Sequence, residues 1–499
     1  MKIKIGDLDF FEKKIRIAKK NNPVEIFEKL REKKINFLFE SDSSNPIYGR
    51  MSLAGINPIL KISGKKNIAE IEILSNRGKI FFDQFIKKTK KFSEFILKKT
   101  SQKIIFKIEK SKQFLPELQR TRRKNIAQIL REFLEIFPAS RSTIFGIFGA
   151  MSYDFSRLFE DLPEILPERK IPDFQFFVFD SFLKFDLLKN KSEIIVFRSS
   201  KNEAEKAAEE ILKKISTKII KKKINCPKIS GIICDTKKSE FEKLVSRGKK
   251  LATHGEIFQI VFSRKIFGQF SGDPFQIYKI YRQKNPSPYL FFFDFGQNQL
   301  VGASPEMMVR VENGIVNLRP IAGSAARGND PITDHENMLQ LLQSEKERAE
   351  LDMLVDLGRN DLARVCKPGI KISDYRSVEK YSKIMHTISH LTGKLQKQFS
   401  AFDAVVACQP AGTLSGAPKI AAMTEIEKSE KSRRGFYGGT IGYFSFSGSV
   451  DTGIIIRSAH FTKNKFEFRV GAGIVFDSDP SSEFKETEKK SAALLEILY

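Results

Sequence analysis

Acidic side chains lie on the predicted core-facing side of the last helix of this chain. The stretch 481–498, SSEFKETEKKSAALLEIL, begins with serines that can cap a helix. At about 3.6 residues per turn, the inward stripe contains Leu494, Ile497 and Leu498 together with Glu483, Glu486, Thr487 and Lys490. The outward side carries Lys485, Glu488, Lys489 and Glu496. An unpaired buried charge is costly, so we expect a compensating group beside these acids.

A second acidic pair lies further upstream on another apolar face. The stretch 335–365 is predicted to be a long amphipathic helix, either continuous or broken near Gly358. Glu350 shares its face with leucine and methionine side chains, and Glu347 lies one turn away. Two interpretations remain open: ion pairs with Lys346 or Lys490, or a shared divalent cation. Two carboxylates from different helices, without a nearby His or Cys, suit Mg²⁺.

A short glycine-containing segment directly precedes the last helix. In RVGAGIVFDSDPSSE, the run Gly471-Ala472-Gly473 lets backbone N–H groups approach a ligand closely. Such N–H groups favour anions. A carboxylated substrate held between a metal ion and these donors would account for both the acids and the glycines.

The elements that must position these residues are mainly antiparallel strands and helices. The stretch 289–323 is predicted to form strands with a tight turn at Asn313-Gly314, and 435–476 a β-meander that includes Arg457 in a strand. Hairpins followed by helices predict an α+β fold with antiparallel sheets. We place a boundary near Pro227, which gives segments 1–235 and 236–499.

Composition narrows the function classes. The chain has 499 residues and a formal net charge of +26, but its lysines are spread throughout, and no DNA-binding motif accompanies them, so a nucleic-acid partner is not expected. No apolar run is long enough to span a membrane, and the start has acids where a signal peptide needs apolar residues. The four cysteines are scattered, which predicts neither a disulfide framework nor a zinc site. We expect a cytoplasmic protein.

Six motifs in order give the chain a family resemblance. They are LRPIAGS (318–324), ELDMLVDLGRNDLARV (350–365), AGTLSGAPK (411–419), GGTIGYF (438–444), IIIRSA (454–459) and VGAGIVFDSDPSSEFKET (470–487). The sequence resembles the chorismate-utilising enzymes and, among them, the branch called anthranilate synthase component I. That resemblance implies an α+β fold in which two large antiparallel sheets form a sandwich with helices outside. The N-terminal segment would carry a regulatory site and the C-terminal segment the catalytic one.

The resemblance also implies a substrate site. Glu350 and Glu486 would ligate Mg²⁺, with Glu347 and Glu483 behind them. The residues that would line the chorismate pocket are Thr413, Tyr443, Arg457, Gly471, Ala472, Gly473 and Lys490. A guanidinium such as that of Arg457 is well shaped to grip a carboxylate.

Four further positions bear on the reaction that this resemblance implies. Glu306 in GASPEMM matches the general acid that protonates the leaving hydroxyl of chorismate. Gln259 stands where water-using relatives carry a Lys base, which favours ammonia as the nucleophile. Ala322 stands where many aminodeoxychorismate synthases carry a nucleophilic Lys, which favours anthranilate synthase. Aminodeoxychorismate synthase component I is the alternative enzyme, since some of its members lack that Lys. His386, expected in a helix, matches the histidine of pyruvate elimination. A basic nucleic-acid-binding or regulatory relative is the non-enzyme alternative.

The resemblance finally implies a partner and an inhibitor. No cysteine has the setting of a glutaminase nucleophile, so ammonia would come from a separate glutamine amidotransferase subunit (component II), in a heterotetramer of two large and two small subunits. FLFES (37–41) and NPSPYLFFF (285–293) resemble the two halves of a tryptophan feedback site. Its predicted residues are Glu40, Ser41, Asn285, Pro286, Ser287 and Tyr289.

Overall fold

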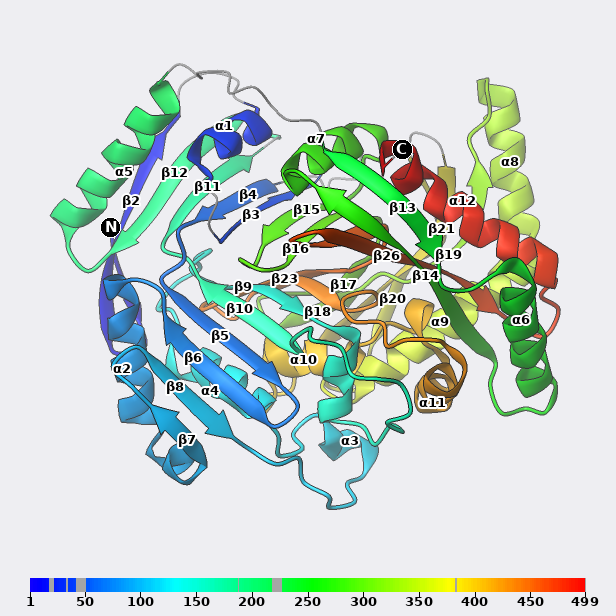
Figure 1. The fold of residues 1–499 in the computed structure, drawn as a ribbon, viewed down its shortest axis with the longest axis horizontal. Coiled ribbons are helices and arrows are strands. Elements are labelled where there is room, and N and C mark those ends of the chain that lie inside the picture. Colours follow the sequence, from blue (N-terminus) through cyan, green and yellow to red (C-terminus); the bar gives the residue numbers. More distant parts are fainter. Residues whose placement is uncertain are drawn as a thin grey trace.

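Two large antiparallel sheets face each other in this protein. The structure is a computed structural model that describes residues 1–17, 22–32, 35–41, 51–186, 188–217, 227–381 and 384–498. Within these ranges the strands form two sheets of 13 strands each. Every strand pairing is antiparallel, and the helices lie on the outside (Figure 1).

The first sheet runs from N-terminal strands at one edge to strands of the second segment at the other. Its order is β1 (Lys2–Ile5), β2 (Leu8–Arg16), β12 (Lys191–Arg198), β11 (Ser181–Asp186), β4 (Met51–Ile56), β3 (Asn36–Glu40), β15 (Tyr289–Asp294), β16 (Gln299–Ser304), β25 (Ser458–Thr462), β26 (Lys465–Ile474), β14 (Gln259–Ser271) and β13 (Lys228–Cys234). The short β22 (Gly416–Ala417) pairs with the start of β14. Because β3 lies between β4 and β15, the segments around residues 40 and 290 become neighbours.

The second sheet is built in the same mixed way. Its order is β19 (Ile321–Ala326), β21 (Ile384–Lys394), β18 (Ile315–Leu318), β17 (Met307–Glu312), β24 (Val450–Ile454), β23 (Thr440–Ser445), β9 (Gly146–Met151), β10 (Phe174–Val178), β5 (Leu60–Lys65), β6 (Ile68–Ile73), β8 (Lys103–Lys107) and β7 (Ile96–Lys99). Strand β20 (Lys371–Lys380) pairs with the free side of β21. Both predicted segments therefore contribute strands to each sheet.

Helices cover the outer faces of both sheets. The first sheet is contacted by α1 (Pro23–Leu30), α5 (Lys201–Ser216), α6 (Lys238–Thr253), α7 (Pro274–Lys284), α11 (Lys419–Ser429) and α12 (Pro480–Leu498). The second is contacted by α2 (Lys79–Lys88), α8 (Pro331–Gln343), α9 (Glu345–Ala363) and α10 (Ala401–Cys408), with α4 (Ala127–Ile136) packed on α2. The short α3 (Glu117–Arg120) lies at the periphery (Figure 1). None of the described helices combines the length and apolarity needed to cross a membrane.

Phenylalanine rings hold the two sheets together. The ring of Phe37 on β3 stacks on that of Phe148 on β9 with 4.6 Å between centroids, and on that of Phe293 on β15 at 5.6 Å. All three side chains are fully buried. Such aromatic pairs add to the free energy of apolar burial, so one continuous core joins strands from both segments.

The predicted α+β sandwich is confirmed, whereas the helix expected over 335–365 differs from the prediction. The Asn313-Gly314 turn joins β17 to β18, and both residues have the positive φ that such a turn requires. The long helix 335–365 is instead two helices, and the break lies at Ser344 rather than near Gly358. Ser344 ends α8 and caps α9, where its hydroxyl accepts the N–H of Glu347. A good capping residue stops a helix more effectively than an interior glycine.

Gly358 offers a test of helix packing. A methyl group there would lie 3.4 Å from Leu391 Cδ2 and 3.6 Å from Leu318 Cδ1, which is ordinary contact. Because a glycine inside a helix is less stable than an alanine there, Gly358→Ala is expected to raise the free energy of unfolding by roughly 0.5–1 kcal/mol. Denaturant unfolding measures this change. The control is Gly412→Ala, whose methyl would overlap Leu357 Cδ2 and should destabilise. A loss of stability in Gly358→Ala would contradict the packing described.

Candidate active site

The acidic faces of α9 and α12 point toward one another. Glu483, Thr487, Leu494 and Leu498 are buried on α12, whereas Lys485, Glu488, Lys489 and Glu496 are exposed, as the helical spacing predicts. On α9, Glu347 and Glu350 are half-buried. Burial, followed by the charges of Glu347 and Glu486, raises the pKa of Glu350 to about 7. Acids from two distant helices therefore share one electrostatic environment.

Lysine side chains offset only part of this charge. Lys490 pairs with Glu486 at 2.5 Å and donates a hydrogen bond to the carbonyl oxygen of Gly471 at 3.0 Å. Lys346 lowers the pKa values of Glu347 and Glu483, but burial keeps both raised. The ion pair with Lys490 that the sequence left open is thus present. In the described ranges, no three acidic, His or Cys side chains form a ready-made metal cage.

The remaining negative charge nevertheless suits one hard cation. Glu350 has a carboxylate whose protonation is favoured by the neighbouring Glu347 and Glu486, and a divalent ion relieves such repulsion. Mg²⁺ is usually bound by one or two carboxylates and completes its shell with water and substrate oxygens. The donor set fits Mg²⁺ on this basis.

Gln259 joins the first sheet to the acids. It opens β14, where it pairs with Ala417, and its side chain is 2% exposed. Its amide Nε2 donates to Glu350 Oε1 at 3.2 Å, while the buried Oε1 has no hydrogen-bond partner in the described part of the chain. A methyl at Gly473 would overlap Gln259 Nε2, so only glycine allows this approach. The free carbonyl oxygen can accept an N–H from a ligand.

Glu306 is a buried acid in the connection between the two sheets. It lies between β16 and β17 and accepts a hydrogen bond from Thr413 Oγ1 at 2.8 Å. Thr413 belongs to the single helical turn Gly412–Leu414, which contacts α9. Burial raises the pKa of Glu306 to about 8, although Thr413 and Lys490 lower it. The carboxyl group is therefore mostly protonated at neutral pH and can donate a proton.

His386 lies in strand β21, not in the helix that we expected. Its Nδ1 is 2.8 Å from Ser324 Oγ and 3.1 Å from the carbonyl oxygen of Gly323, across the pairing of β19 with β21. Burial, with the charges of Arg457 and Lys490, lowers the pKa of His386 to about 4. The imidazole is neutral, and the carbonyl partner assigns the hydrogen to Nδ1, so that Nε2 carries the lone pair.

Arg457 belongs to the same cluster, although its local structure differs from the prediction. It lies between β24 and β25 with φ of +48°, rather than within a strand. Its carbonyl oxygen accepts hydrogen bonds from Ala303 N and Tyr281 OH, both at 3.0 Å. These contacts hold the left-handed conformation. The guanidinium lowers the pKa values of His386 and Tyr437, so its charge reaches both side chains.

Tyr443 does not belong to this cluster, and Tyr437 was missed. Tyr443 stacks on Phe148 at 5.2 Å and lines a separate cavity. Tyr437 instead lies beside Gly471, where an added methyl would be 2.9 Å from its hydroxyl oxygen. Burial raises the pKa of Tyr437 to about 12. The glycine-flanked loop before β23 was the available signal, because ligands bind where loops meet strand ends.

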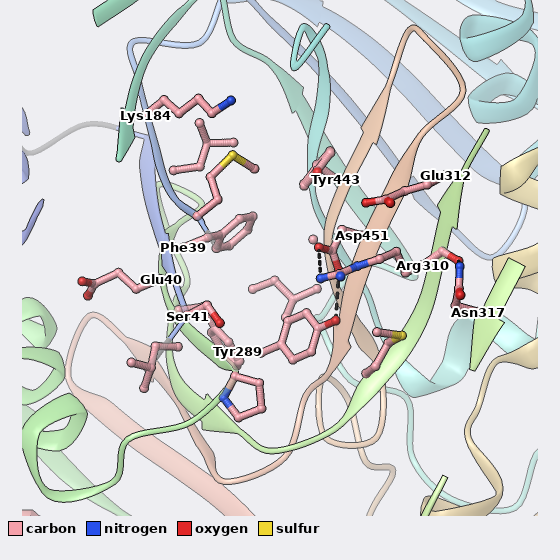
Figure 2. A pocket seen from close by; sticks show the side chains of 18 of the residues that line it. Phe39, Glu40, Ser41, Lys184, Tyr289, Arg310, Glu312, Asn317, Tyr443 and Asp451 are labelled. Carbon is pink, nitrogen blue, oxygen red and sulfur yellow. Dashed lines mark hydrogen bonds and ion pairs between the residues drawn. The ribbon is translucent and has the colours of Figure 1, made fainter. Parts of the chain in front are cut away.

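The separate cavity contains half of the predicted inhibitor residues. Its volume is about 440 Å³, and Glu40, Ser41 and Tyr289 line it (Figure 2). They meet there because Glu40 on β3 is the direct pairing partner of Leu290 on the adjacent strand β15. Asn285, Pro286 and Ser287 are not among its lining residues, and Pro288 and Leu290 line it instead. Ser287 donates its hydroxyl to the carbonyl oxygens of Asn285 and Ala303.

Glu40 and Ser41 differ in how their side chains are satisfied. Both oxygens of Glu40 accept hydrogen bonds from Arg282, at 2.9 and 3.0 Å, and one also accepts from Tyr278 at 2.5 Å. Ser41 Oγ is buried and has no hydrogen-bond partner in the described part of the chain. An unpartnered buried hydroxyl at a cavity wall is suited to bind a polar group of a ligand.

Comparison with known proteins gives a consistent result. The family model for "chorismate binding enzyme" matches residues 82–496. The protein named anthranilate synthase component 1 from Aquifex aeolicus is 33% identical, over 95% of this chain and 92% of that relative. Its namesake from Acetivibrio thermocellus is 34% identical, over 96% and 93%.

Solved structures agree on the fold. The crystal structure of anthranilate synthase component I from Streptococcus pneumoniae TIGR4 superposes with a TM-score of 0.71 at 29% identity, and covers 96% of this chain and 99% of the other. MenF, the menaquinone-specific isochorismate synthase from Escherichia coli, has a TM-score of 0.68 at 16% identity over 100% and 96%, which is a likeness of fold alone.

Proposed function

Because this chain belongs to the chorismate-binding enzyme family, we propose that it converts chorismate and ammonia into anthranilate and pyruvate. The proposal combines the names of its relatives with the site geometry. One observation carries the choice of nucleophile: the side chain of Gln259, a neutral amide, points into the acidic cluster and donates to Glu350. An amide cannot deprotonate water at neutral pH, whereas ammonia needs no base before it attacks.

The first half-reaction replaces the C4 hydroxyl of chorismate with an amino group at C2. Glu306 protonates the leaving hydroxyl, because burial keeps its carboxyl group neutral. The unpartnered Gln259 Oε1 accepts an N–H of ammonia and orients the nitrogen for attack. Arg457 and Lys490 bind the carboxylates of the substrate, and the backbone at Gly471 and Gly473 lets the substrate lie close to β26. The product of this step is 2-amino-2-deoxyisochorismate and water.

The second half-reaction eliminates pyruvate. The neutral Nε2 of His386 accepts the proton at C2, and breakage of the bond to the pyruvyl oxygen makes the ring aromatic. Glu350 and Glu486 would hold Mg²⁺, with Glu347 and Glu483 beside them. A bound Mg²⁺ supplies positive charge against the ring carboxylate of the substrate.

We also propose that a separate glutaminase subunit delivers the ammonia, in an assembly of two large and two small subunits. Among the described cysteines, Cys366 and Cys408 are buried, and burial raises the pKa of the Cys366 thiol to about 11. A thiol of high pKa is a poor glutaminase nucleophile. The half-buried Cys234 donates to the carbonyl oxygen of Thr236.

Product analysis tests the proposal. The purified chain is incubated with chorismate, Mg²⁺ and ammonium at raised pH, where more of the nitrogen is neutral ammonia. We expect fluorescent anthranilate and an equal amount of pyruvate, with little product when glutamine replaces ammonium. A 4-amino product that retains the pyruvyl group would identify aminodeoxychorismate synthase instead. Efficient use of glutamine by the chain alone would contradict the separate subunit.

The 440 Å³ cavity is proposed to bind tryptophan as a feedback inhibitor. Ser41→Ala removes a buried lining hydroxyl that has no hydrogen-bond partner among the described residues. Loss of a hydrogen bond to a charged amino group is expected to weaken tryptophan binding about tenfold or more. The inhibitor concentration that halves the ammonium-dependent rate measures this effect. The control is Ser230→Ala on β13, an exposed serine that does not line this cavity. Unchanged inhibition in Ser41→Ala would exclude this assignment.

A further inference from the structure

Strand β17 separates the large cavity from a much smaller one. The small cavity has a volume of about 50 Å³, and Glu306, Thr413 and Gly358 are among its lining residues. Met307, the first residue of β17, lines both cavities. The general acid Glu306 directly precedes it in the chain. A single strand end therefore faces the proposed inhibitor on one side and the proposed proton donor on the other.

A chain of direct contacts links the large cavity to this strand end. A methyl at Gly453 would lie 2.8–3.1 Å from three atoms of Tyr289, so the Tyr289 ring rests on the backbone of β24. Gly453 is the strand partner of Met307. The next residue, Ile454, donates its N–H to the carbonyl oxygen of Glu306 at 3.1 Å. Movement of Tyr289 must therefore be accommodated by the two strands that hold Glu306.

Polar contacts tie Tyr289 to β17 at a second point. Tyr289 OH donates to Asp451 Oδ1 at 3.0 Å, and Arg310 Nη2 pairs with Asp451 Oδ2 at 2.7 Å (Figure 2). Arg310 belongs to β17 and Asp451 to β24, and both side chains line the large cavity. The ring and the hydroxyl of Tyr289 thus engage the same pair of strands.

The pairing register of β17 with β24 shifts next to Met307. Between Met307 and Val309 the pairing with β24 is irregular, so Met308 is an extra residue on the β17 side. Such bulges bend a strand locally and redirect its side chains. The bulge therefore interrupts the regular pairing of β17 with β24 directly after Met307.

We propose that Met307 couples the two cavities: a ligand that engages Tyr289 in the large cavity displaces Met307 and moves Glu306 out of its hydrogen bond with Thr413. This inference rests on the proposed function, in which the ligand is tryptophan and Glu306 is the acid. A shift of about 1 Å at a catalytic group is enough to lower a rate strongly. By linkage, chorismate must weaken tryptophan binding by the same factor.

Reciprocal binding measurements test the coupling. The chain contains no tryptophan residues, so the indole fluorescence of added tryptophan reports its binding directly. The Kd of tryptophan is measured with and without saturating chorismate and Mg²⁺, without ammonium. For the native chain we expect chorismate to raise this Kd at least about fivefold. In Met307→Ala we expect a ratio near one, with tryptophan still bound.

A matched variant separates coupling from binding. Lys184 lines the large cavity from β11, far along the chain from β17, so Lys184→Ala is expected to change the tryptophan Kd but keep the native ratio. If Met307→Ala does not fold, Met307→Leu, which keeps the side-chain volume, should lower the ratio in the same direction. A native ratio in both Met307 variants would overturn the coupling.

The outcomes also separate this inference from the proposed function. A chain that forms anthranilate and binds tryptophan with a Kd independent of chorismate overturns the coupling alone. A chain that binds no tryptophan overturns the proposed inhibitor site together with the coupling. Absence of anthranilate formation overturns the proposed function directly.

Discussion

Replacement of Glu306 by glutamine is expected to lower kcat by about 10²–10⁴-fold, the usual contribution of a positioned proton donor. The introduced amide would keep the size and one hydrogen bond of the glutamate, but it has no acidic proton for the leaving hydroxyl. Thr413 Oγ1 lies 2.8 Å from Glu306 Oε1, so the variant retains a partner, and misfolding is not expected. The ammonium-dependent rate of anthranilate formation measures the effect.

The pH profile gives the same group a second test. Burial raises the pKa of Glu306 from its usual value to about 8, so the proton donor is present below that pH and is lost as the pH rises through it. The rate of the native chain, divided by the concentration of neutral ammonia, should therefore fall above about pH 8. This fall at high pH should be missing in Glu306→Gln. The control is Glu336→Gln on the exposed side of α8. A Glu306→Gln rate within about tenfold of the native rate would contradict the assignment.

Replacement of Glu350 by glutamine is expected to lower kcat/KM at least about 100-fold, because a proposed Mg²⁺ ligand is lost. The same replacement is expected to stabilise the fold when Mg²⁺ is absent. Burial and the charges of Glu347 and Glu486 raise the pKa of Glu350 to about 7. A raised carboxyl pKa destabilises the fold once the pH exceeds the unfolded value, and the penalty is complete above about pH 7. Without Mg²⁺, Glu350→Gln should therefore unfold at a higher temperature than the native chain at pH 8.

Thermal unfolding with and without Mg²⁺ checks that prediction. The stabilisation of Glu350→Gln should shrink toward pH 5, and Mg²⁺ should raise the unfolding temperature of the native chain only. Glu488→Gln, on the exposed side of α12, is the matched control. Equal stabilisation of Glu350→Gln and the native chain by Mg²⁺ would argue against Glu350 as a ligand.

Residue spacing predicted the acidic faces and the sheet class well. The inward stripe of α12 follows from a single helical repeat, which depends only on local geometry. The alternation of strands and the Asn313-Gly314 turn are equally local signals, and both are confirmed. The pairing of β3 with β15 is long-range. The pairing itself was not predicted; only the proximity of the two segments was expected, because both resemble halves of one known site.

The errors arose where tertiary contacts decide. His386 was expected in a helix but pairs within β21, and Arg457 leaves the strand because Tyr281 and Ala303 hold its carbonyl oxygen. Tyr443 was expected in the substrate pocket from the family resemblance alone, but its side chain lines the other cavity, and Tyr437 lies beside Gly471. In the inhibitor segment, residues 285–287 pack against α7 and β16, and the strand that follows supplies the cavity wall.

The most direct test of the central claim is a calorimetric titration of the chain with Mg²⁺. In the proposed site, carboxylates of α9 and α12 bind one ion between them, near Gln259. We predict one Mg²⁺ per native chain and loss of that binding in both Glu350→Gln and Glu486→Gln. Undiminished Mg²⁺ binding in both variants, or none in the native chain, would contradict it.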